Sequence, residues 1–174
     1  MQAKPMQPFL ISLLVLILLI SAAALVPIKR SYVFIDNRTE QIALQLPVED
    51  PLFQIKYIHS IHLSEVLESY KVLKDDRLQM TGMEYEDFNI GMPSNAGDGE
   101  TFGEKDGKYF ITGMKRELPN FRIFIGDIDA GLSFISNGYE YDLKKTLVRG
   151  QSYTFQVQRL SLIQQLRGVN IDEQ

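Results

Sequence analysis

The sequence contains no cysteine, and this absence removes several kinds of site at once. The chain forms no disulfide bond, offers no thiolate to a metal ion and has no cysteine nucleophile. A lipid anchor attached through cysteine is excluded for the same reason. The redox compartment stays open, because a domain that folds without disulfides is compatible with the cell exterior and with the cytosol.

Several motifs of catalysis and of nucleic-acid binding are also missing. The 174 residues include 18 Lys and Arg and 22 Asp and Glu, and the formal net charge is −4. The cations are scattered, whereas nucleic-acid binding requires clustered cations that neutralise phosphates, so we expect no nucleic-acid partner. No G-x-S-x-G elbow, phosphate-cradling glycine loop or zinc-protease motif is present. We therefore expect a protein that is not an enzyme and that uses no cofactor.

One long apolar run, residues 9–26, contains no charged residue. As a helix it would be about 27 Å long, close to the roughly 30 Å thickness of the hydrocarbon core of a bilayer. We expect a transmembrane helix or uncleaved signal anchor, with residues 1–8 as a cytoplasmic tail. The protein would then be a single-pass protein of the cell membrane with its globular domain outside the cytoplasm. Cleavage near the small residues 22–24, as in a signal peptide, is the alternative.

Residues 31–160 predict one β-rich domain. The clearest strand is Ser152–Gln158, in which Tyr153, Phe155 and Val157 share one face and polar residues occupy the other. This period of two is typical of a half-buried strand. Many short strands separated by turn residues favour an all-β fold, either an antiparallel barrel or a sandwich.

The connections of this domain are marked by turn residues. Asn137-Gly138 is a strong hairpin turn, since both residues accept positive φ. Residues 89–106 are rich in glycine and polar residues and predict a long loop, which is either solvated or placed at the mouth of the domain to contact a ligand. Residues 161–174 are expected to be a C-terminal tail, with a short helix near 160–166.

The segment 53–72 carries the most informative polar residues. Alternation places His59 on an apolar face of one strand and Glu68 on an apolar face of the next. A hairpin that turns near His62-Leu63 would bring the imidazole close to the carboxylate. Because a buried carboxylate requires a partner, the two side chains form a structural pair, a ligand pocket or, in the third alternative, a catalytic site.

His59 and His62 also have the H-x-x-H spacing of some zinc sites. On a helix the two imidazoles would share a face, but on a strand residues three apart face opposite ways. We therefore expect no metal site. The alternative is a metal-dependent hydrolase that uses His59, His62 and nearby acidic residues.

Several short elements of the sequence resemble a known family. They are Tyr57-Ile58-His59-Ser60-Ile61, then Glu68, Tyr70 and Val72, then Gly91-Met92-Pro93, and finally Gly150 before the alternating strand near the end. On these residues the chain resembles the bacterial domain-of-unknown-function family 1850, over roughly residues 34–158. The resemblance implies an extracytoplasmic β-rich domain behind one hydrophobic segment, and a link with tripartite (TRAP-type) solute transporters.

These observations together predict a membrane-anchored accessory or binding module that assists a TRAP-type transporter. A purely structural envelope protein is the other non-enzymatic alternative. Besides the membrane, the expected partners are a transporter subunit or a small anionic solute. The resemblance and the strand pattern make the following residues the expected ligand-binding set: His59, Ser60, Glu68, Tyr70, Gly91 and Pro93.

Overall fold

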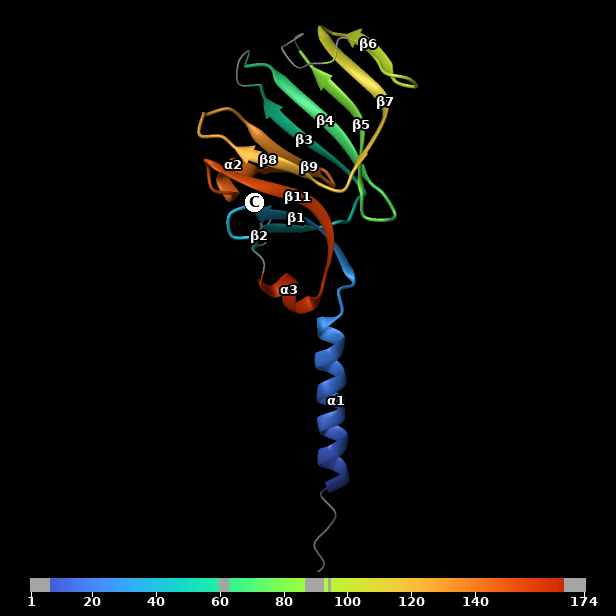
Figure 1. Cartoon of the computed structure of the whole chain (residues 1–174), viewed down its shortest axis with the longest axis vertical. Coiled ribbons are helices and arrows are strands. Elements are labelled where there is room, and N and C mark those ends of the chain that lie inside the picture. The colour runs from blue at the N-terminus through green and yellow to red at the C-terminus, as the bar shows by residue number, and fades with distance from the viewer. Residues whose placement is uncertain (1–6, 60–62, 87–92, 94, 168–174) are drawn as a thin grey trace, which may run out of the picture.

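The computed structural model describes residues 7–59, 63–86, 93 and 95–167 of the chain. Within this part, antiparallel strands form two sheets, with the orders β2-β1-β11-β8 and β10-β9-β3-β4-β5-β7-β6. Neither sheet closes on itself in the described residues, and the two pack face to face as a sandwich (Figure 1). The all-β prediction is therefore confirmed, and a closed barrel is not formed.

The helices and strands have the following bounds. They are α1 (Gln7–Leu25), β1 (Lys29–Asp36), β2 (Ile42–Pro47), β3 (Leu52–Ile58), β4 (Glu65–Val72), β5 (Leu78–Tyr85), β6 (Thr101–Lys105), β7 (Lys108–Leu118), β8 (Phe121–Ile125), β9 (Leu132–Ser136), β10 (Tyr139–Asp142), α2 (Leu143–Thr146), β11 (Gln151–Leu160) and α3 (Leu162–Arg167).

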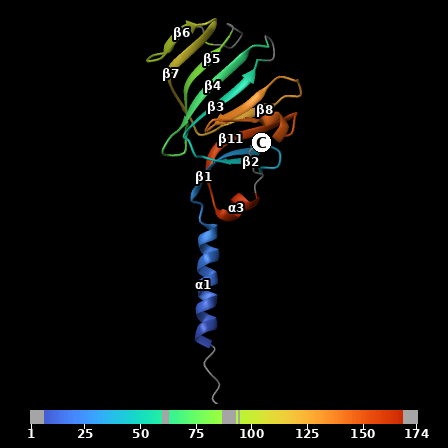
Figure 2. The same ribbon diagram turned by 180° about the vertical axis from the view of Figure 1, so that it is seen from behind.

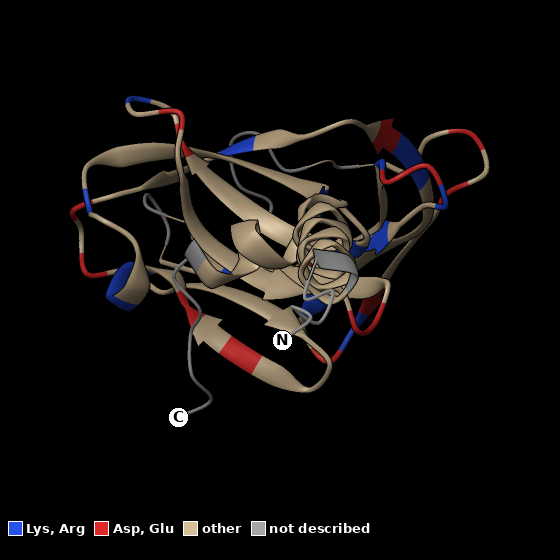
Figure 3. Cartoon of the chain, turned by 90° about the horizontal axis from the view of Figure 1, so that it is seen from below, with Lys and Arg blue, Asp and Glu red and all other residues tan. Residues whose placement is uncertain are grey.

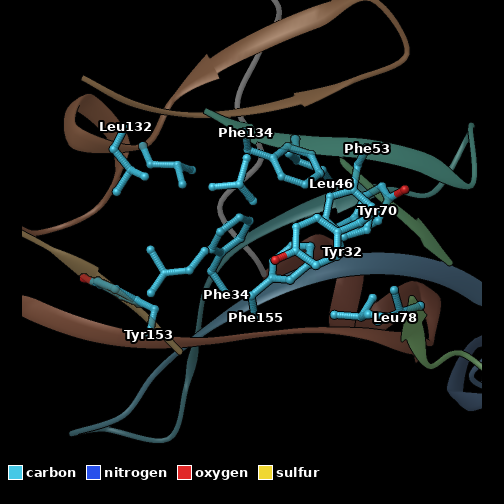
Figure 4. Packing of buried hydrophobic residues seen from close by; sticks show 14 of the residues in the cluster. Tyr32, Phe34, Leu46, Phe53, Tyr70, Leu78, Leu132, Phe134, Tyr153 and Phe155 are labelled. Atoms are coloured by element: carbon cyan, nitrogen blue, oxygen red, sulfur yellow. The ribbon is translucent and has the colours of Figure 1, made fainter. Parts of the chain in front are cut away.

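The core between the sheets contains a cluster of aromatic rings that come from both sheets, among aliphatic side chains (Figure 4). Tyr32 of β1 contacts Phe53 of β3 edge-on, with ring centroids 5.2 Å apart, and Phe134 of β9 at 5.0 Å. Phe155 of β11 lies 5.2 Å from Phe53 and 5.6 Å from Phe134. Edge-on and offset contacts of this kind suit the charge distribution of aromatic rings, so the cluster joins the sheets specifically.

The seven-stranded sheet is wider than the sheet that covers it. Its β5-β7-β6 half extends away from the four-stranded sheet, as views from opposite sides show (Figure 1 and Figure 2). The chain changes sheets between β7 and β8, so β8 lies at the edge of the smaller sheet. Side chains of the seven-stranded sheet that lie near β8 are therefore only partly covered by the smaller sheet. The candidate site lies among these side chains.

One sequence prediction needs correction, and another is confirmed. The expected loop 89–106 contains a strand, β6, which pairs with β7 through a turn at Asp106-Gly107, where both residues have positive φ. Gly103 interrupts the alternation of apolar and polar residues in this short strand, so the sequence pattern does not indicate a strand here. The short helix expected near residues 160–166 is confirmed as α3, and hydrogen bonds attach it to the domain.

The helix α1 precedes the domain and exposes its apolar side chains. Phe9 is 71 % exposed, and Leu19 is 63 % exposed. In the described part of the chain, no helix has both the length and the apolar character that are needed to cross a membrane. The transmembrane role expected for residues 9–26 therefore stays a prediction.

Candidate functional site

Glu68 lies in a row of side chains that crosses the inner face of the seven-stranded sheet. On β4 it is opposite Ile55 of β3 and Met83 of β5. It is half-buried, and it alone carries a formal charge among the seven described residues of the row. From one edge to the other, the row consists of Phe102, Ile111, Met83, Glu68, Ile55, Phe134 and Tyr141.

Two tyrosines hold the carboxylate of Glu68. The hydroxyl of Tyr57 donates to Oε1 at 3.2 Å, and the hydroxyl of Tyr70 donates to Oε2 at 2.6 Å. Burial, followed by the negative charge of Glu68, raises the pKa of both phenols above the ordinary value for tyrosine. Both hydroxyls therefore remain protonated donors at neutral pH, and each carboxylate oxygen has a fixed partner.

The packing of the two sheets fixes the position of Tyr70. Its ring stacks on Phe53 of β3, with centroids 5.1 Å apart and an interplanar angle of 5°. Phe121 of β8, in the other sheet, stacks on it at 5.2 Å. Tyr70 is 7 % exposed, whereas Tyr57 and Glu68 are half-buried. One side of the site is thus rigid core, and the other side is accessible.

The predicted hairpin between β3 and β4 is confirmed, but the predicted approach of His59 to Glu68 is wrong. The amide of His59 donates to the carbonyl of Ser64, and the amide of Leu63 donates to the carbonyl of His59. Because these two hydrogen bonds close the hairpin tightly, Ile55 is the residue of β3 that lies opposite Glu68. His59 therefore lies about four residues, or roughly 13 Å, along the sheet from the position opposite Glu68.

The other predicted site residues have different outcomes. Ser60 and Gly91 lie outside the described residues, as does His62. Pro93 is described, and its carbonyl accepts a hydrogen bond from the hydroxyl of Tyr85 on β5. Tyr85 belongs to the inner-face row next to that of Glu68, so Pro93 reaches the face that carries the site. Whether these residues bind a ligand stays a prediction.

Tyr57 is the site residue that the predicted ligand-binding set lacked. It is two residues before His59, on the same face of the strand pattern as Ile55, and it belongs to the motif that carries the family resemblance. The sequence did contain a signal for Tyr57, because its phenol falls on the same predicted sheet face as the carboxylate of Glu68. Met83 had no such signal, because only the pairing of β4 with β5 places it opposite Glu68.

The described residues contain no group of three or more His, Cys, Asp or Glu side chains that could hold a metal ion. The carboxylate of Glu68 has phenol donors rather than imidazoles around it. The arrangement can accept hydrogen bonds and attract positive charge.

The comparisons with known proteins agree with the resemblance noted in the sequence. Residues 53–143 match the model of a family described as a domain of unknown function (DUF1850). The matched region extends from β3 to the first residue of α2 and includes Glu68 and both tyrosines that hold it. No curated protein and no solved structure matches the chain.

Proposed function

The chain belongs to the DUF1850 family, and we propose that it is a membrane-attached, non-enzymatic binding module whose ligand contacts Glu68. One observation carries the binding proposal: a half-buried carboxylate stands in an otherwise uncharged row, held by two tyrosine hydroxyls. Placing a carboxylate there costs solvation energy, which a partner of opposite charge can restore. The site is therefore suited to recognition.

The charge of the site favours a cationic or N–H-donating ligand. In the described part of the chain, no Lys or Arg forms an ion pair with Glu68. Each carboxylate oxygen has a second lone pair beyond the one that accepts from tyrosine. Nearby aromatic and thioether side chains would contact an apolar body and stabilise a cation. We therefore propose an ammonium-type ligand in place of the anionic solute expected from the sequence.

The membrane attachment rests on α1. Its side chains from Phe9 to Ile20 include many large apolar groups that are more than 40 % exposed. Viewed end-on, the described part of this helix contains no charged residue, in contrast to the domain around it (Figure 3). Because so much apolar surface is unfavourable in water, we propose that α1 is embedded in the lipid bilayer of the cell membrane, with the domain outside the cytoplasm.

The transporter link supplies the biological role that we propose. A module held at the outer surface of the membrane would present a ligand, or a bound transporter subunit, close to a TRAP-type transporter. The family resemblance supports this assignment. The immobilised full chain should retain transporter subunits. Loss of these subunits when α1 is deleted would assign retention to anchoring, whereas their loss with Glu68→Gln would assign it to recognition at the Glu68 site.

A ligand-dependent thermal melt tests the binding site. The full chain in phospholipid nanodiscs would be melted with benzylammonium and with benzoate, two ligands of similar shape and opposite charge. We expect benzylammonium to raise the melting temperature of the wild type, since a ligand that binds only the folded state stabilises it. The shift should vanish in Glu68→Gln, and benzoate should have no effect.

Glu65→Gln is the matched control. Glu65 lies on the same strand but faces the opposite side of the sheet, where its carboxylate is 3.6 Å from Nζ of Lys108. Benzylammonium should still stabilise this variant. A shift that Glu68→Gln retains would place binding elsewhere and contradict the proposal.

A structural role for the site is the second candidate. The two tyrosine hydrogen bonds already occupy both carboxylate oxygens, and Tyr70 belongs to the core between the sheets. In this case Glu68→Gln would lower the melting temperature in the same way with and without any ligand. The same melts therefore decide between the two candidates.

A further inference from the structure

The short helix α3 has a well-defined start. The amide of Ser161 donates to Oε1 of Gln164 at 2.9 Å, and the amide of Gln164 donates to Oγ of Ser161 at 3.3 Å. This reciprocal pair is a capping box, which satisfies two amides that a helix leaves unpaired at its N-terminus. The helix is therefore specified by its own sequence.

Further hydrogen bonds attach α3 to the four-stranded sheet. Gln45 of β2, which is 3 % exposed, donates from Nε2 to the carbonyl of Gln165 at 2.6 Å. The side chain of Gln165 donates in turn to the carbonyl of Leu160, at the end of β11. The direction in which α3 presents its remaining side chains is consequently fixed relative to the domain.

Two large apolar side chains of α3 point away from the domain. Leu162 is 53 % exposed and Leu166 is 86 % exposed. They are four residues apart, so they lie on one face of the helix, one turn above the other. The polar contacts of α3 with the sheet come from Gln165 and leave this leucine face open.

The helix that carries the leucine face lies beside α1. The two helices are in contact, and α3 lies at the end of the domain from which α1 extends (Figure 1). Ile28, in the connection from α1 to β1, is also exposed, at 64 %. Segments from both ends of the chain thus meet where α1 joins the domain.

We propose that Leu162 and Leu166 insert into the interfacial region of the bilayer that holds α1. This inference rests on the proposed membrane attachment. The occupant is lipid because α3 contacts α1, and a bilayer that surrounds α1 up to its last turn also reaches the leucine face. One helix alone would leave the domain free to tilt, whereas a second contact beside it restricts the tilt and fixes the orientation of the Glu68 site relative to the membrane.

Spin labels can test this arrangement directly, because the absence of native cysteine makes every introduced thiol unique. Leu162→Cys and Leu166→Cys would be labelled in the full chain, in nanodiscs of phosphatidylcholine and phosphatidylglycerol. Leu14→Cys in α1 is the lipid reference, and Lys105→Cys, at the end of β6, is the aqueous reference. The measurement is the ratio of collisions with oxygen, which enters lipid, to collisions with a water-soluble nickel chelate.

We expect both α3 labels to show ratios several-fold above that of Lys105→Cys and below that of Leu14→Cys. If the Leu14→Cys label is in lipid while both α3 labels match Lys105→Cys, the interfacial contact is wrong and the attachment by α1 stands. If the Leu14→Cys label is itself aqueous, the membrane attachment fails and the α3 contact fails with it.

Discussion

Tyr70 and Glu68 lie two positions apart on β4, and the hydroxyl of Tyr70 donates a 2.6 Å hydrogen bond to Oε2 of Glu68. Residues i and i+2 of a strand point to the same face, so the strand itself brings the two groups together. Stacking on Phe53 and Phe121 holds the phenol ring. The same side chain therefore contributes to the stability of the sandwich and to the geometry of the candidate site.

Removing the hydroxyl of Tyr70 should destabilise the fold without leaving a cavity in the core. Tyr70→Phe keeps the ring but deletes a hydrogen bond to a charged acceptor, which is worth about 1.5–3 kcal/mol. We expect a loss of this size in the free energy of unfolding, measured by urea denaturation of the full chain in micelles. Tyr57→Phe deletes a longer hydrogen bond, of 3.2 Å, and should cost less. An unchanged midpoint for Tyr70→Phe would show that the hydrogen bond does not contribute.

High pH should unfold the domain through its buried tyrosines. Burial raises the pKa of Tyr32 to about 12, and burial together with Glu68 also raises the pKa of Tyr57 and Tyr70. In the unfolded chain a tyrosine loses its proton near pH 10, so above this pH the unfolded state binds fewer protons than the folded state. Stability that is fully present below pH 10 is therefore lost as the pH rises towards 12 and beyond.

The corresponding measurement is the melting temperature as a function of pH between 8 and 12. The wild type should show a steep fall above pH 10. Tyr70→Phe should start lower but fall less steeply, because it removes one of the titrating groups. Parallel curves for the two proteins would mean that Tyr70 does not titrate with unfolding.

The sequence predicted the faces of the strands better than their pairing. Alternation in Ser152–Gln158 identified β11, and Asn137-Gly138 identified the turn between β9 and β10, where both residues have positive φ. Each of these signals is local, because a side-chain period of two or a demand for positive φ is written in consecutive residues. Such signals carry over directly from sequence to structure.

The candidate site depended on register, which is not local. Alternation correctly placed Glu68 on an apolar face, but the closure of the turn at His59 and Ser64 decides which residue lies opposite it. A shift in this turn moves every cross-strand pair along the sheet without changing the faces when the shift is even. The sequence could therefore identify Glu68 as a candidate site residue. It could not show that Tyr57, and not the expected His59, lies beside the carboxylate of Glu68.

Asp76 joins the two sheets on the side of the domain near α1. Its Oδ1 lies 2.6 Å from Nε of Arg30 on β1, and Oδ2 lies 3.1 Å from Nε of Arg159 on β11. Arg30 also donates to the carbonyl of Leu73 at 2.6 Å, so the turn between β4 and β5 is held against the smaller sheet. The side chains of Arg30 and Asp76 are 29 % and 23 % exposed, which limits screening by solvent.

Asp76→Asn should release this connection. Asparagine accepts the positive φ of 67° at this position, so the variant tests the charge and not the backbone. We expect a loss of about 1–2 kcal/mol in the free energy of unfolding, since the partly buried Arg30 and the exposed Arg159 both lose their anion. Asp75→Asn is the control: among the described residues Asp75 forms its ion pair with the exposed Arg77, so this variant should leave the urea midpoint unchanged. Equal effects from both variants would argue against a special role for Asp76.

Gly82 lets β5 and β7 approach each other beside the candidate site. A Cβ at this position would lie 2.8 Å from the carbonyl oxygen of Ile111, which is backbone and cannot move aside without displacing β7. Ile111 and Met83, the residue after Gly82, belong to the row of Glu68. Gly82→Ala should therefore separate these strands, destabilise the domain by about 1–3 kcal/mol and weaken stabilisation by benzylammonium.

Gly126→Ala is the matched control for that substitution. A Cβ at Gly126 would meet no atom closer than 3.9 Å, and its φ lies outside the left-handed region. This variant should be neutral or slightly stabilised, because alanine restricts the unfolded chain. Urea denaturation of both variants measures the difference. If Gly82→Ala unfolds at the wild-type midpoint, the close approach of β5 and β7 does not constrain the sheet, and the row around Glu68 tolerates wider spacing than its geometry implies.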